Sequence, residues 1–454
     1  MPTDLLSPLP VSLQTHPFRE VLVGAMKAAL NAVNGELAVR QTLRQEGNQL
    51  WVGETAYPLH PEGQLFVLAV GKAALAMARG AKASLGERLS KGLIITKFQP
   101  QNEPADFPVL LGDHPLPKGR SLRAARAVER FLKLLSPKDT LICLISGGAS
   151  ALLTSPRPPL RLQDLKKTTR LLLRCGANIH ELNTIRKHLE RFKGGGIVQT
   201  VHAGQVISLI ISDVIGDSIE VIGSGMTAPD ASTFQDALQI IEQYDLLPSL
   251  PTRVREYLLE GSQGYHPETL KPEASLFEKV ANHIIASNRH ACEAAHHYLQ
   301  KSGIETLHLT SHLQGEASQV GKVFAAFARQ LCVSRSDSAH PICWIAGGET
   351  TVTVHGDGVG GRNSELALGA VSDMDGLKGA LLITLATDGD DGFSAAAGAV
   401  VSGSTAQRAR KLGLQPNDFL RRNDSFTFFN HLQDCIFTTP TQTNVNDMIF
   451  LFVS

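Results

Sequence analysis

The sequence has no surplus of charge of either sign. Its 43 lysines and arginines balance 43 aspartates and glutamates over 454 residues. Proteins that attract nucleic acid or membrane surfaces need clustered positive charge, and the longest basic cluster, within residues 186–191, is short. We therefore expect neither nucleic acid nor a membrane as a partner.

Long apolar runs and paired cysteines are also missing. No apolar run reaches the roughly 18 residues of a membrane-spanning helix, and the first residues lack the basic and apolar regions of a signal peptide. The six cysteines include no CxxC pair, and Cys143, Cys292 and Cys343 lie in apolar or helical contexts typical of core residues. These absences predict a cytoplasmic enzyme in a reducing compartment.

What the sequence does contain is a repeated pattern of an apolar run, a glycine-bearing polar turn and a helical segment. The pattern occurs five times, at residues 66–81, 140–153, 206–218, 341–351 and 381–392. Apolar runs without alternation are typical of strands buried on both faces of a parallel sheet. The pattern predicts an open, doubly wound α/β fold in which the five turns converge on one crevice.

Chain length and local composition predict more than one domain. A chain of 454 residues suggests two or three domains at roughly 150 residues each. Prolines at 248, 251 and 267 and a polar stretch at 334–340 suggest connections between them. We expect a doubly wound N-terminal domain over residues 1–245, a helical bridging segment over 246–339 and a smaller α/β C-terminal domain over 340–454.

The glycine turns are candidate phosphate-binding sites. Consecutive glycines let successive backbone N–H groups point at an anion, and a helix that starts just afterwards adds its dipole. The best example is Ser146-Gly147-Gly148-Ala149-Ser150, where two hydroxyls flank the double glycine. Glycines needed only for a tight, packed turn are the alternative interpretation.

Two cations lie inside such turns. Lys72 follows Gly71, and Arg362 follows Gly360-Gly361, with no acidic residue four positions away on either side. A guanidinium can bind a phosphate or carboxylate through two parallel hydrogen bonds. We therefore predict that both cations contact a transferring phosphate or a substrate carboxylate, against the alternative of solvated surface charges.

Carboxylates occur in other glycine-bearing turns. The candidate magnesium ligands are Asp213, Asp217, Glu349 and Asp388, because magnesium prefers oxygen ligands and is usually held by one or two carboxylates plus substrate phosphates. Asp213 is also the first candidate for a general base. Helix capping is the alternative role for each aspartate. His114, between prolines in a rigid loop, is expected either to line the crevice or to pack in its loop.

Standard motifs for other chemistries fit poorly. Residues 315–322 have one residue too many for a Walker A loop, and no GxSxG nucleophile elbow occurs. Residues 356–361 do satisfy GxGxxG, after an alternating segment that looks like an exposed antiparallel strand. That match is the only support from the residues for a dinucleotide-binding enzyme.

Seven motifs, in order, cover the chain from about residue 17 to 452: AVGKAA (69–74), GDHPLPKGRS (112–121), LISGGASALL (144–153), ELNTIRKHLERFKGGG (181–196), SDVIGDSIEVIGSGMTAPD (212–230), IAGGETTVTVHGDGVGGRNSELAL (345–368) and TNVNDM (443–448). Together they resemble the class II glycerate kinases, whose C-terminal part is the MOFRL domain. Two departures stand out. Thr439 and Gln442 replace glycines of the last motif, and Phe393-Ser394-Ala395 replaces a usual Pro-Thr-Asp.

The resemblance implies a glycerate 2-kinase that uses ATP and Mg²⁺ to convert D-glycerate to 2-phosphoglycerate. It implies a Rossmann-like N-terminal domain, a smaller MOFRL domain and an active site in the cleft between them. The family's catalytic lysine and arginine correspond to Lys72 and Arg362. Some relatives carry the label hydroxypyruvate reductase, so an NAD(P)H-dependent reductase is the alternative and a nucleotide-sensing module a third. Whether identical chains form an oligomer stays open.

Overall fold

The computed structural model describes residues 6–98, 107–334, 340–439 and 441–454. The chain forms two compact units. Unit 1 contains Met1–Asn34 and Ala286–Ser454, and unit 2 contains Gly35–Ile285. None of the helices in the described ranges is long and apolar enough to span a membrane.

Unit 2 is built on a six-stranded sheet in the spatial order β6-β5-β4-β7-β8-β9. Its strands are β4 (Leu65–Val70), β5 (Leu89–Thr96), β6 (Val109–Leu111), β7 (Thr140–Ile145), β8 (Gln205–Ile211) and β9 (Val280–Ala286). The ladders that join β6, β5, β4, β7 and β8 are all parallel. In chain order this arrangement is 3-2-1-4-5-6, the strand order of a Rossmann fold. The predicted doubly wound α/β architecture is confirmed for this unit.

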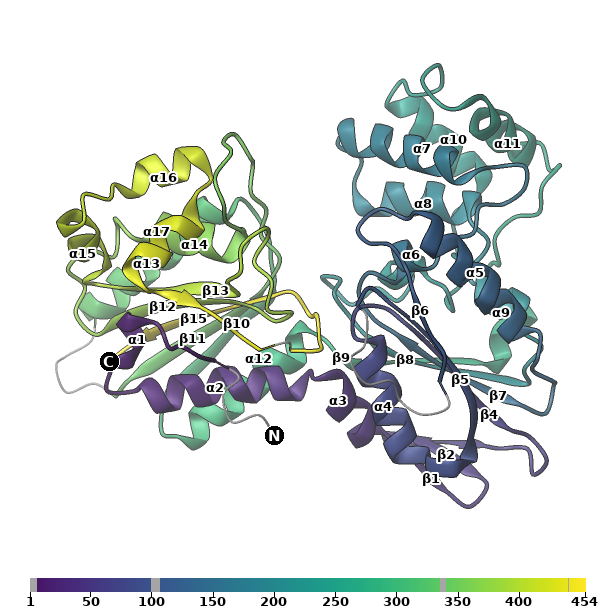
Figure 1. Ribbon diagram of the computed structural model, residues 1–454, viewed down its shortest axis with the longest axis horizontal. Coiled ribbons are helices and arrows are strands. Elements are labelled where there is room, and N and C mark those ends of the chain that lie inside the picture. Colours follow the sequence, from purple (N-terminus) through teal and green to yellow (C-terminus); the bar gives the residue numbers. More distant parts are fainter. Residues whose placement is uncertain (1–5, 99–106, 335–339, 440) are drawn as a thin grey trace. The chain divides into compact units, whose positions relative to one another are not determined.

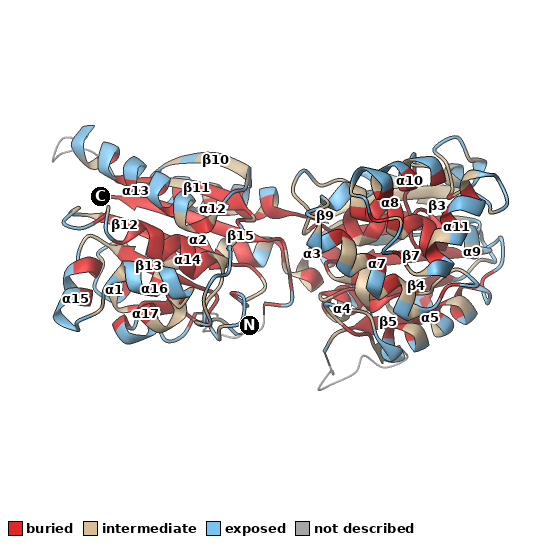
Figure 2. Cartoon of the chain, turned by 90° about the horizontal axis from the view of Figure 1, so that it is seen from above, coloured by how far each residue is buried: buried red, intermediate tan, exposed pale blue. Residues whose placement is uncertain are grey.

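The central strands of unit 2 are apolar because both faces of the sheet are covered. Every residue of β4 and β7 is buried, and Figure 2 shows buried strands flanked by helices with exposed outer faces. The remaining elements are α3 (Gly35–Thr42), a small antiparallel sheet β1 (Leu43–Glu46), β2 (Gln49–Val52) and β3 (Thr55–Pro58), and the helices α4 (Ala74–Leu85), η1 (Gly86–Arg88), α5 (Gly119–Leu132), α6 (Ala149–Leu152), α9 (Gly196–Thr200), η2 (Ile222–Ser224) and η3 (Ser275–Lys279).

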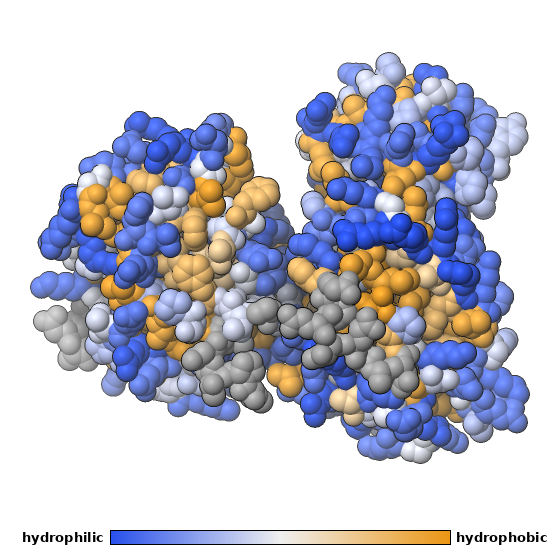
Figure 3. Space-filling view, viewed as in Figure 1, coloured by the Kyte–Doolittle hydropathy of each residue, from blue (hydrophilic) through white to orange (hydrophobic). Residues whose placement is uncertain are grey.

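Four helices of unit 2 form a separate cluster with its own apolar core. They are α7 (Leu162–Arg174), α8 (Ile179–Leu189), α10 (Phe234–Gln243) and α11 (Thr252–Ser262), and Figure 1 shows them together at one end of the unit. Their shared core includes Leu172, Ile185 and Phe234. Their outward surface in Figure 3 is mostly hydrophilic, as expected for amphipathic helices.

Unit 1 contains a mixed six-stranded sheet in the order β10-β11-β15-β12-β13-β14. Only β10 and β11 are parallel; the other ladders are antiparallel. The strands are β10 (Glu305–Leu313), β11 (Ile342–Gly348), β12 (Ala380–Ala386), β13 (Gly398–Ser402), β14 (Cys435–Ile436) and β15 (Asp447–Val453). The helices are α1 (Val11–Gln14), α2 (Arg19–Ala32), α12 (Asn288–Lys301), α13 (Ala317–Ser334), α14 (Arg362–Ala370), α15 (Thr405–Lys411), α16 (Pro416–Arg422) and α17 (Ser425–Leu432).

The chain is divided differently from the three expected segments. Helix α2 packs in unit 1, although it lies far from the rest of that unit in sequence. The expected bridging segment 246–339 includes strands of both sheets, β9 and β10, and the boundary between the units falls inside it. Proline-rich stretches therefore mark loops within a unit here and do not mark a separate segment.

The five predicted turns belong to two different sheets, and their convergence on one crevice stays a prediction. Three of the five apolar runs form β4, β7 and β8 of the unit 2 sheet, and the other two form β11 and β12 of the unit 1 sheet. Within unit 1, β11 and β12 both run antiparallel to β15, so their carboxyl ends lie at the same edge as the start of β15. Each unit thus gathers its own turns at one sheet edge.

Candidate active site

Two glycine turns meet at the centre of the unit 2 sheet. Gly71 and Lys72 follow β4, and the turn at 146–150 follows the neighbouring strand β7. The Lys72 N–H donates to the Gly147 carbonyl (2.9 Å), and the Ala73 N–H donates to Ser146 Oγ (3.1 Å). Strand order reverses between β4 and β7, and ligands of open α/β sheets bind at such a reversal.

The residues of these turns divide into two groups. Ser146 and Gly147 accept the hydrogen bonds that join the two turns, and Gly71 packs directly against the fully buried Ser146. Gly148 (φ 82°) and Ser150 line a pocket. Helix α6 after the turn is only four residues long, so a helix dipole adds little to the predicted phosphate site. Phosphate binding by these five residues stays a prediction. Gly148 and Ser150 are the best placed for it, because they line the pocket.

Alanine at Gly71 is expected to destabilise unit 2. Gly71 has φ 140°, and a Cβ there would lie 2.1 Å from Ser146 Oγ. We expect backbone strain of about 1–3 kcal/mol plus about 1–3 kcal/mol of overpacking. Gly176→Ala is the control, because Gly176 also has positive φ but open space around its Cβ. Denaturant unfolding should show a clearly larger loss for Gly71→Ala; equal losses would mean that the turns are not packed tightly here.

A pocket of about 360 Å³ lies beside these turns, and we call it the turn pocket. Its walls come from residues 114–117, the segment 148–154, helices α7 and α8, Lys193 and Asp213. Of the predicted residues, it therefore brings together His114, Gly148, Ser150 and Asp213. Asp217 does not line it and lies in the loop after β8.

His114 lines the turn pocket as a neutral imidazole. Burial, with the positive charges of Lys72 and Lys97, lowers the pKa of His114 to about 4. A Cβ added to Gly148 would lie 3.2 Å from His114 Nε2 and 3.5 Å from the side chain of Lys72. At neutral pH, the positive charge at this point thus comes from Lys72, and His114 can only donate or accept hydrogen bonds.

The turn pocket also contains charged residues that sequence reasoning missed. Arg186, Glu190 and Lys193 line it, and Lys193 Nζ lies 3.3 Å from Glu190 Oε1 although both side chains are almost fully buried. Burial lowers the pKa of Lys193. The sequence signal that could have indicated these residues is the run of charged side chains within 181–196. Part of that run lies on α8, whose amphipathic pattern predicts a solvated charged face.

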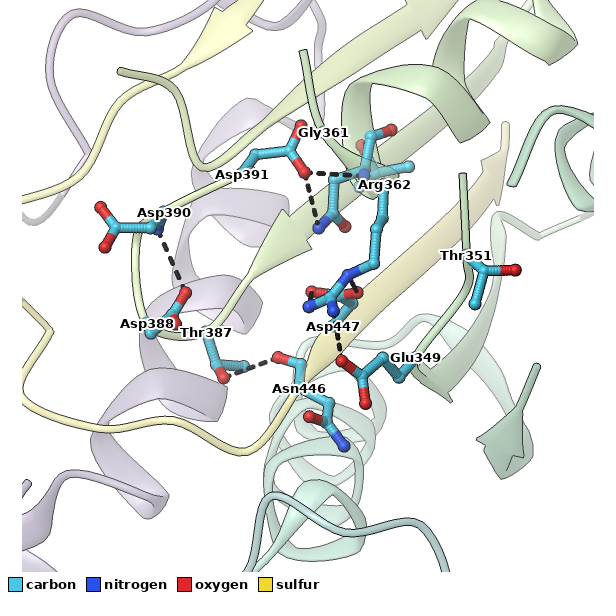
Figure 4. Close-up of polar contacts among 12 residues, drawn as sticks. Glu349, Thr351, Gly361, Arg362, Thr387, Asp388, Asp390, Asp391, Asn446 and Asp447 are labelled. Carbon is cyan, nitrogen blue, oxygen red and sulfur yellow. Dashed lines mark hydrogen bonds and ion pairs between the residues drawn. The ribbon is translucent and has the colours of Figure 1, made fainter. Parts of the chain in front are cut away.

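The edge of the unit 1 sheet holds Arg362, Glu349 and Asp447, which we call the arginine cluster (Figure 4). Arg362 begins α14, Glu349 follows β11 and Asp447 begins β15. Arg362 donates a hydrogen bond to Glu349, and its Nε lies 2.9 Å from Asp447 Oδ2. Both carboxylates hold the pKa of Arg362 above its ordinary value, against the effect of burial. Local sequence could not show these partners, because they lie 13 and 85 positions away.

The start of α14 is capped by Asp391. Its carboxylate accepts hydrogen bonds from the N–H groups of Asn363 and Ser364, both at 2.9 Å. The Gly361 N–H donates to Ser364 Oγ (3.1 Å), and Cβ atoms on Gly360 and Gly361 would lie within 2.3 Å of Ser425 and Asp391. These glycines therefore permit close packing. Phosphate binding by Gly360 and Gly361 stays a prediction, and the Gly361 N–H already donates to Ser364.

The candidate magnesium ligands are distributed over both units. Asp213 and Asp217 belong to unit 2, and Glu349 and Asp388 belong to unit 1. Asp388 accepts a hydrogen bond from the Asp390 N–H (3.2 Å), as Figure 4 shows. Over the described ranges, no three His, Cys, Asp or Glu side chains are grouped so that they could hold a metal ion. A metal bound here would need ligands from its substrate.

Glu365, the fourth residue of α14, gives a prediction for stability against pH. Burial raises the pKa of its carboxyl to about 7 from an ordinary 4.5. Between these values the folded protein keeps a proton that the unfolded chain has lost, so the wild type loses stability as pH rises from about 4.5 to about 7. Glu365→Gln should be more stable than wild type at pH 8, with the advantage vanishing near pH 4.5. A stability difference that does not change with pH would contradict this environment for Glu365.

The GxGxxG match at 356–361 lacks the context of a dinucleotide site. Residues 352–355 form no strand, in contrast to the expected exposed antiparallel strand, and the described part of the preceding segment has only one isolated bridge, at Thr351. The sheet of this unit is mostly antiparallel. A dinucleotide fingerprint requires a buried parallel strand directly before the glycines.

The departures from the resembling family's motifs lie at surface loops. Phe393 is 99% exposed, so the large side chain does not enter the core. Gln442 has φ 56°, a left-handed conformation that favours the glycine it replaces. Gln442 therefore carries local backbone strain that a glycine at this position would avoid.

Comparisons with known proteins agree with this architecture. A profile described as "Domain of unknown function (DUF4147)" matches residues 21–259, and a profile described as "MOFRL family" matches 342–447. The D-glycerate 2-kinase of Thermotoga maritima is 34% identical over 95% of this chain and 97% of its own length. The glycerate 2-kinase of Pyrococcus horikoshii is 36% identical over 96% of this chain and 97% of its own length.

A solved structure shows the same fold. The crystal structure of glycerate kinase (EC 2.7.1.31) from Thermotoga maritima superposes with a TM-score of 0.83 at 33% identity, covering 96% of this chain and 99% of the other. Sequence and fold therefore agree along nearly the whole chain. The protein belongs to the glycerate 2-kinase family of enzymes, whose C-terminal part is the MOFRL domain.

Proposed function

We propose that the protein transfers the γ-phosphoryl group of ATP to the 2-hydroxyl of D-glycerate, giving 2-phosphoglycerate and ADP. The similarity to a protein named D-glycerate 2-kinase over 95% of the chain carries this proposal. The positions of Lys72 and Arg362 support it, since each unit presents one cation at a sheet edge among glycine turns. We place the reaction in the cytoplasm, in keeping with six cysteines that are all unpaired.

In the proposed reaction, the glycerate 2-oxygen forms a bond to the γ-phosphorus while the bond from that phosphorus to the bridging oxygen of ADP breaks. Lys72 and Arg362 stabilise negative charge on the phosphoryl oxygens, which is the main catalytic task in phosphoryl transfer. Asp213 is our candidate general base and accepts the hydroxyl proton.

Magnesium fits the donor groups at both sheet edges. Asp213 and Asp217 at one edge, and Glu349 and Asp388 at the other, offer hard carboxylate oxygens. A typical magnesium site has one or two carboxylates and is completed by phosphates, so a single one of these carboxylates could serve. When bound, magnesium would neutralise phosphate charge. The residues above would otherwise position the substrates and move the proton.

The direct test incubates the purified chain with MgATP in the presence and absence of D-glycerate. We expect ADP to form only when glycerate is present. A parallel incubation with hydroxypyruvate and NAD(P)H tests the reductase alternative, for which we expect no cofactor oxidation. Oxidation of NAD(P)H without glycerate-dependent ADP would replace the proposed function with a reductase, and inactivity in both arms would favour a nucleotide-sensing module.

A further inference from the structure

The turn pocket has a polar end that the proposed reaction has not yet used. Leu165, Leu172, Ile185 and Leu189 form an apolar wall, and Ser150, Arg186, Glu190 and Lys193 lie against the turn that follows β7. Apolar surroundings strengthen any ion pair formed inside the pocket. Pockets of this size and composition, about 300–1,000 Å³ with a few polar groups, are typical of small-molecule sites.

Arg186 is the first indication of an anionic ligand. It lines the pocket, and within the described residues none of its guanidinium N–H groups donates a hydrogen bond. Burial lowers its pKa to about 10, opposed by the negative charge of Glu190, so it stays cationic at neutral pH. A guanidinium that is mostly enclosed and still has unused donors is matched to a carboxylate or phosphate.

Glu190 is the second, independent indication. The residue is 1% exposed. Its Oε1 accepts from the Ser155 N–H (2.9 Å) and lies 3.3 Å from Lys193 Nζ. Its Oε2 is buried and has no hydrogen-bond partner in the described structure. A buried carboxylate oxygen without a donor costs free energy unless a ligand group supplies the hydrogen bond.

The charges of the turn pocket suit a ligand with one negative charge. Three cations line it (Lys166, Arg186 and Lys193) against two carboxylates (Asp213 and Glu190), while His114 is neutral. The surplus is therefore one positive charge, three minus two. Glu190 is already paired with Lys193, which leaves Lys166 and Arg186. Of these two, Arg186 lies beside Glu190 and Lys193, whose charges interact with its own, so Arg186 is the cation best placed for the ligand.

We infer that Arg186, supported by Lys193, binds the carboxylate of the hydroxy-acid substrate and that Glu190 accepts a hydrogen bond from one of its hydroxyl groups. This inference rests on the proposed function and names the subsite for the acceptor. Lys193 Nζ donates to the Ser150 carbonyl (3.0 Å), so the subsite is fixed to the same turn that carries Gly148. In glycerate, the C2 hydroxyl is on the carbon next to the carboxylate. A carboxylate held by Arg186 therefore fixes the position of the C2 hydroxyl more closely than that of the C3 hydroxyl, which favours phosphorylation at C2.

The test compares Arg186→Gln and Arg186→Lys with a control, Arg174→Gln. Arg174 is exposed in the last turn of α7 and does not line the pocket. We expect Arg186→Gln to raise KM for D-glycerate at least tenfold while KM for ATP stays within twofold. Arg186→Lys keeps the charge without the bidentate fork, so its KM for D-glycerate should lie between those of wild type and Arg186→Gln. The control Arg174→Gln should have the KM of wild type.

A binding readout separates this inference from the proposed function. D-glycerate without ATP should raise the melting temperature of the wild type and of Arg174→Gln, but not of Arg186→Gln, and neutral glycerol should raise none of them. An unchanged KM for glycerate in Arg186→Gln, or a rise confined to KM for ATP, would overturn the subsite. A wild-type protein that is stabilised by glycerate but forms no ADP would instead refute the kinase.

Discussion

Replacing Arg362 with alanine is expected to lower kcat for glycerate phosphorylation by about 10³-fold or more, the scale at which an arginine stabilises the transition state of phosphoryl transfer. Arg362, the first residue of α14, forms ion pairs with Glu349 and with buried Asp447. These partners fix the direction of the guanidinium, so that its remaining donors can meet a phosphoryl group. Arg362→Lys should recover only a small part of the rate, because an ammonium lacks the planar fork.

Loss of Arg362 also leaves Asp447 buried without its partner, so a control for stability is needed. Arg408 provides it: this arginine lies in the same unit and pairs at 2.7 Å with Asp434, a fully buried carboxylate. Arg408→Ala should destabilise unit 1 by a comparable amount and leave kcat of the folded enzyme within about twofold of wild type. If the folded Arg408→Ala enzyme loses as much kcat as the folded Arg362→Ala enzyme, the loss is not specific to Arg362 and its proposed catalytic role is wrong.

Replacing Lys72 with alanine should lower kcat by about 10²–10³-fold, the cost of removing one preorganised group that stabilises developing negative charge. The Lys72 N–H donates a hydrogen bond to the double-glycine turn. This bond fixes the backbone position from which the side chain of Lys72 extends. Lys82→Ala is the matched control. Lys82 lies in the last turn of α4, the helix that follows the same turn, and should leave kcat unchanged.

A spectroscopic readout shows whether Lys72 has the environment described here. Its charge lowers the pKa of His114, together with burial and Lys97. Removing the charge should therefore raise the pKa of His114 in an NMR titration, while the Lys82→Ala variant leaves it in place. No shift in the Lys72→Ala variant would mean that the two side chains are farther apart than the structure has them.

Periodicity and glycine placement were sufficient to predict three of the six strands of the unit 2 sheet. The runs that became β4, β7 and β8 are apolar throughout because helices cover both faces, and that pattern is local. The same reasoning also found β11 and β12, but it did not show that they belong to a second, mostly antiparallel sheet. Strand direction depends on pairing with β15 at the end of the chain, which no local pattern reports.

The candidate site was predictable only where its residues lie in turns. Lys72 and Arg362 were recognisable from the glycines beside them. The pairing of Asp447 with Arg362 and the capping of α14 by Asp391 were not, because strand pairing and the start of α14 bring these partners together. Arg186, Glu190 and Lys193 were hidden for another reason: charges on an amphipathic helix usually face solvent, and only the tertiary packing of α8 turns these toward a pocket.

The measurement that tests the account most directly is a ³¹P NMR analysis of the products formed from MgATP and D-glycerate by wild type, Lys72→Ala, Arg362→Ala and Arg408→Ala. We predict ADP and 2-phosphoglycerate from the wild type and from Arg408→Ala, and almost no phosphorylated product from the other two. Formation of 3-phosphoglycerate would contradict phosphorylation at the 2-hydroxyl. Undiminished product from a folded Lys72→Ala or Arg362→Ala variant would contradict the catalytic role of that cation.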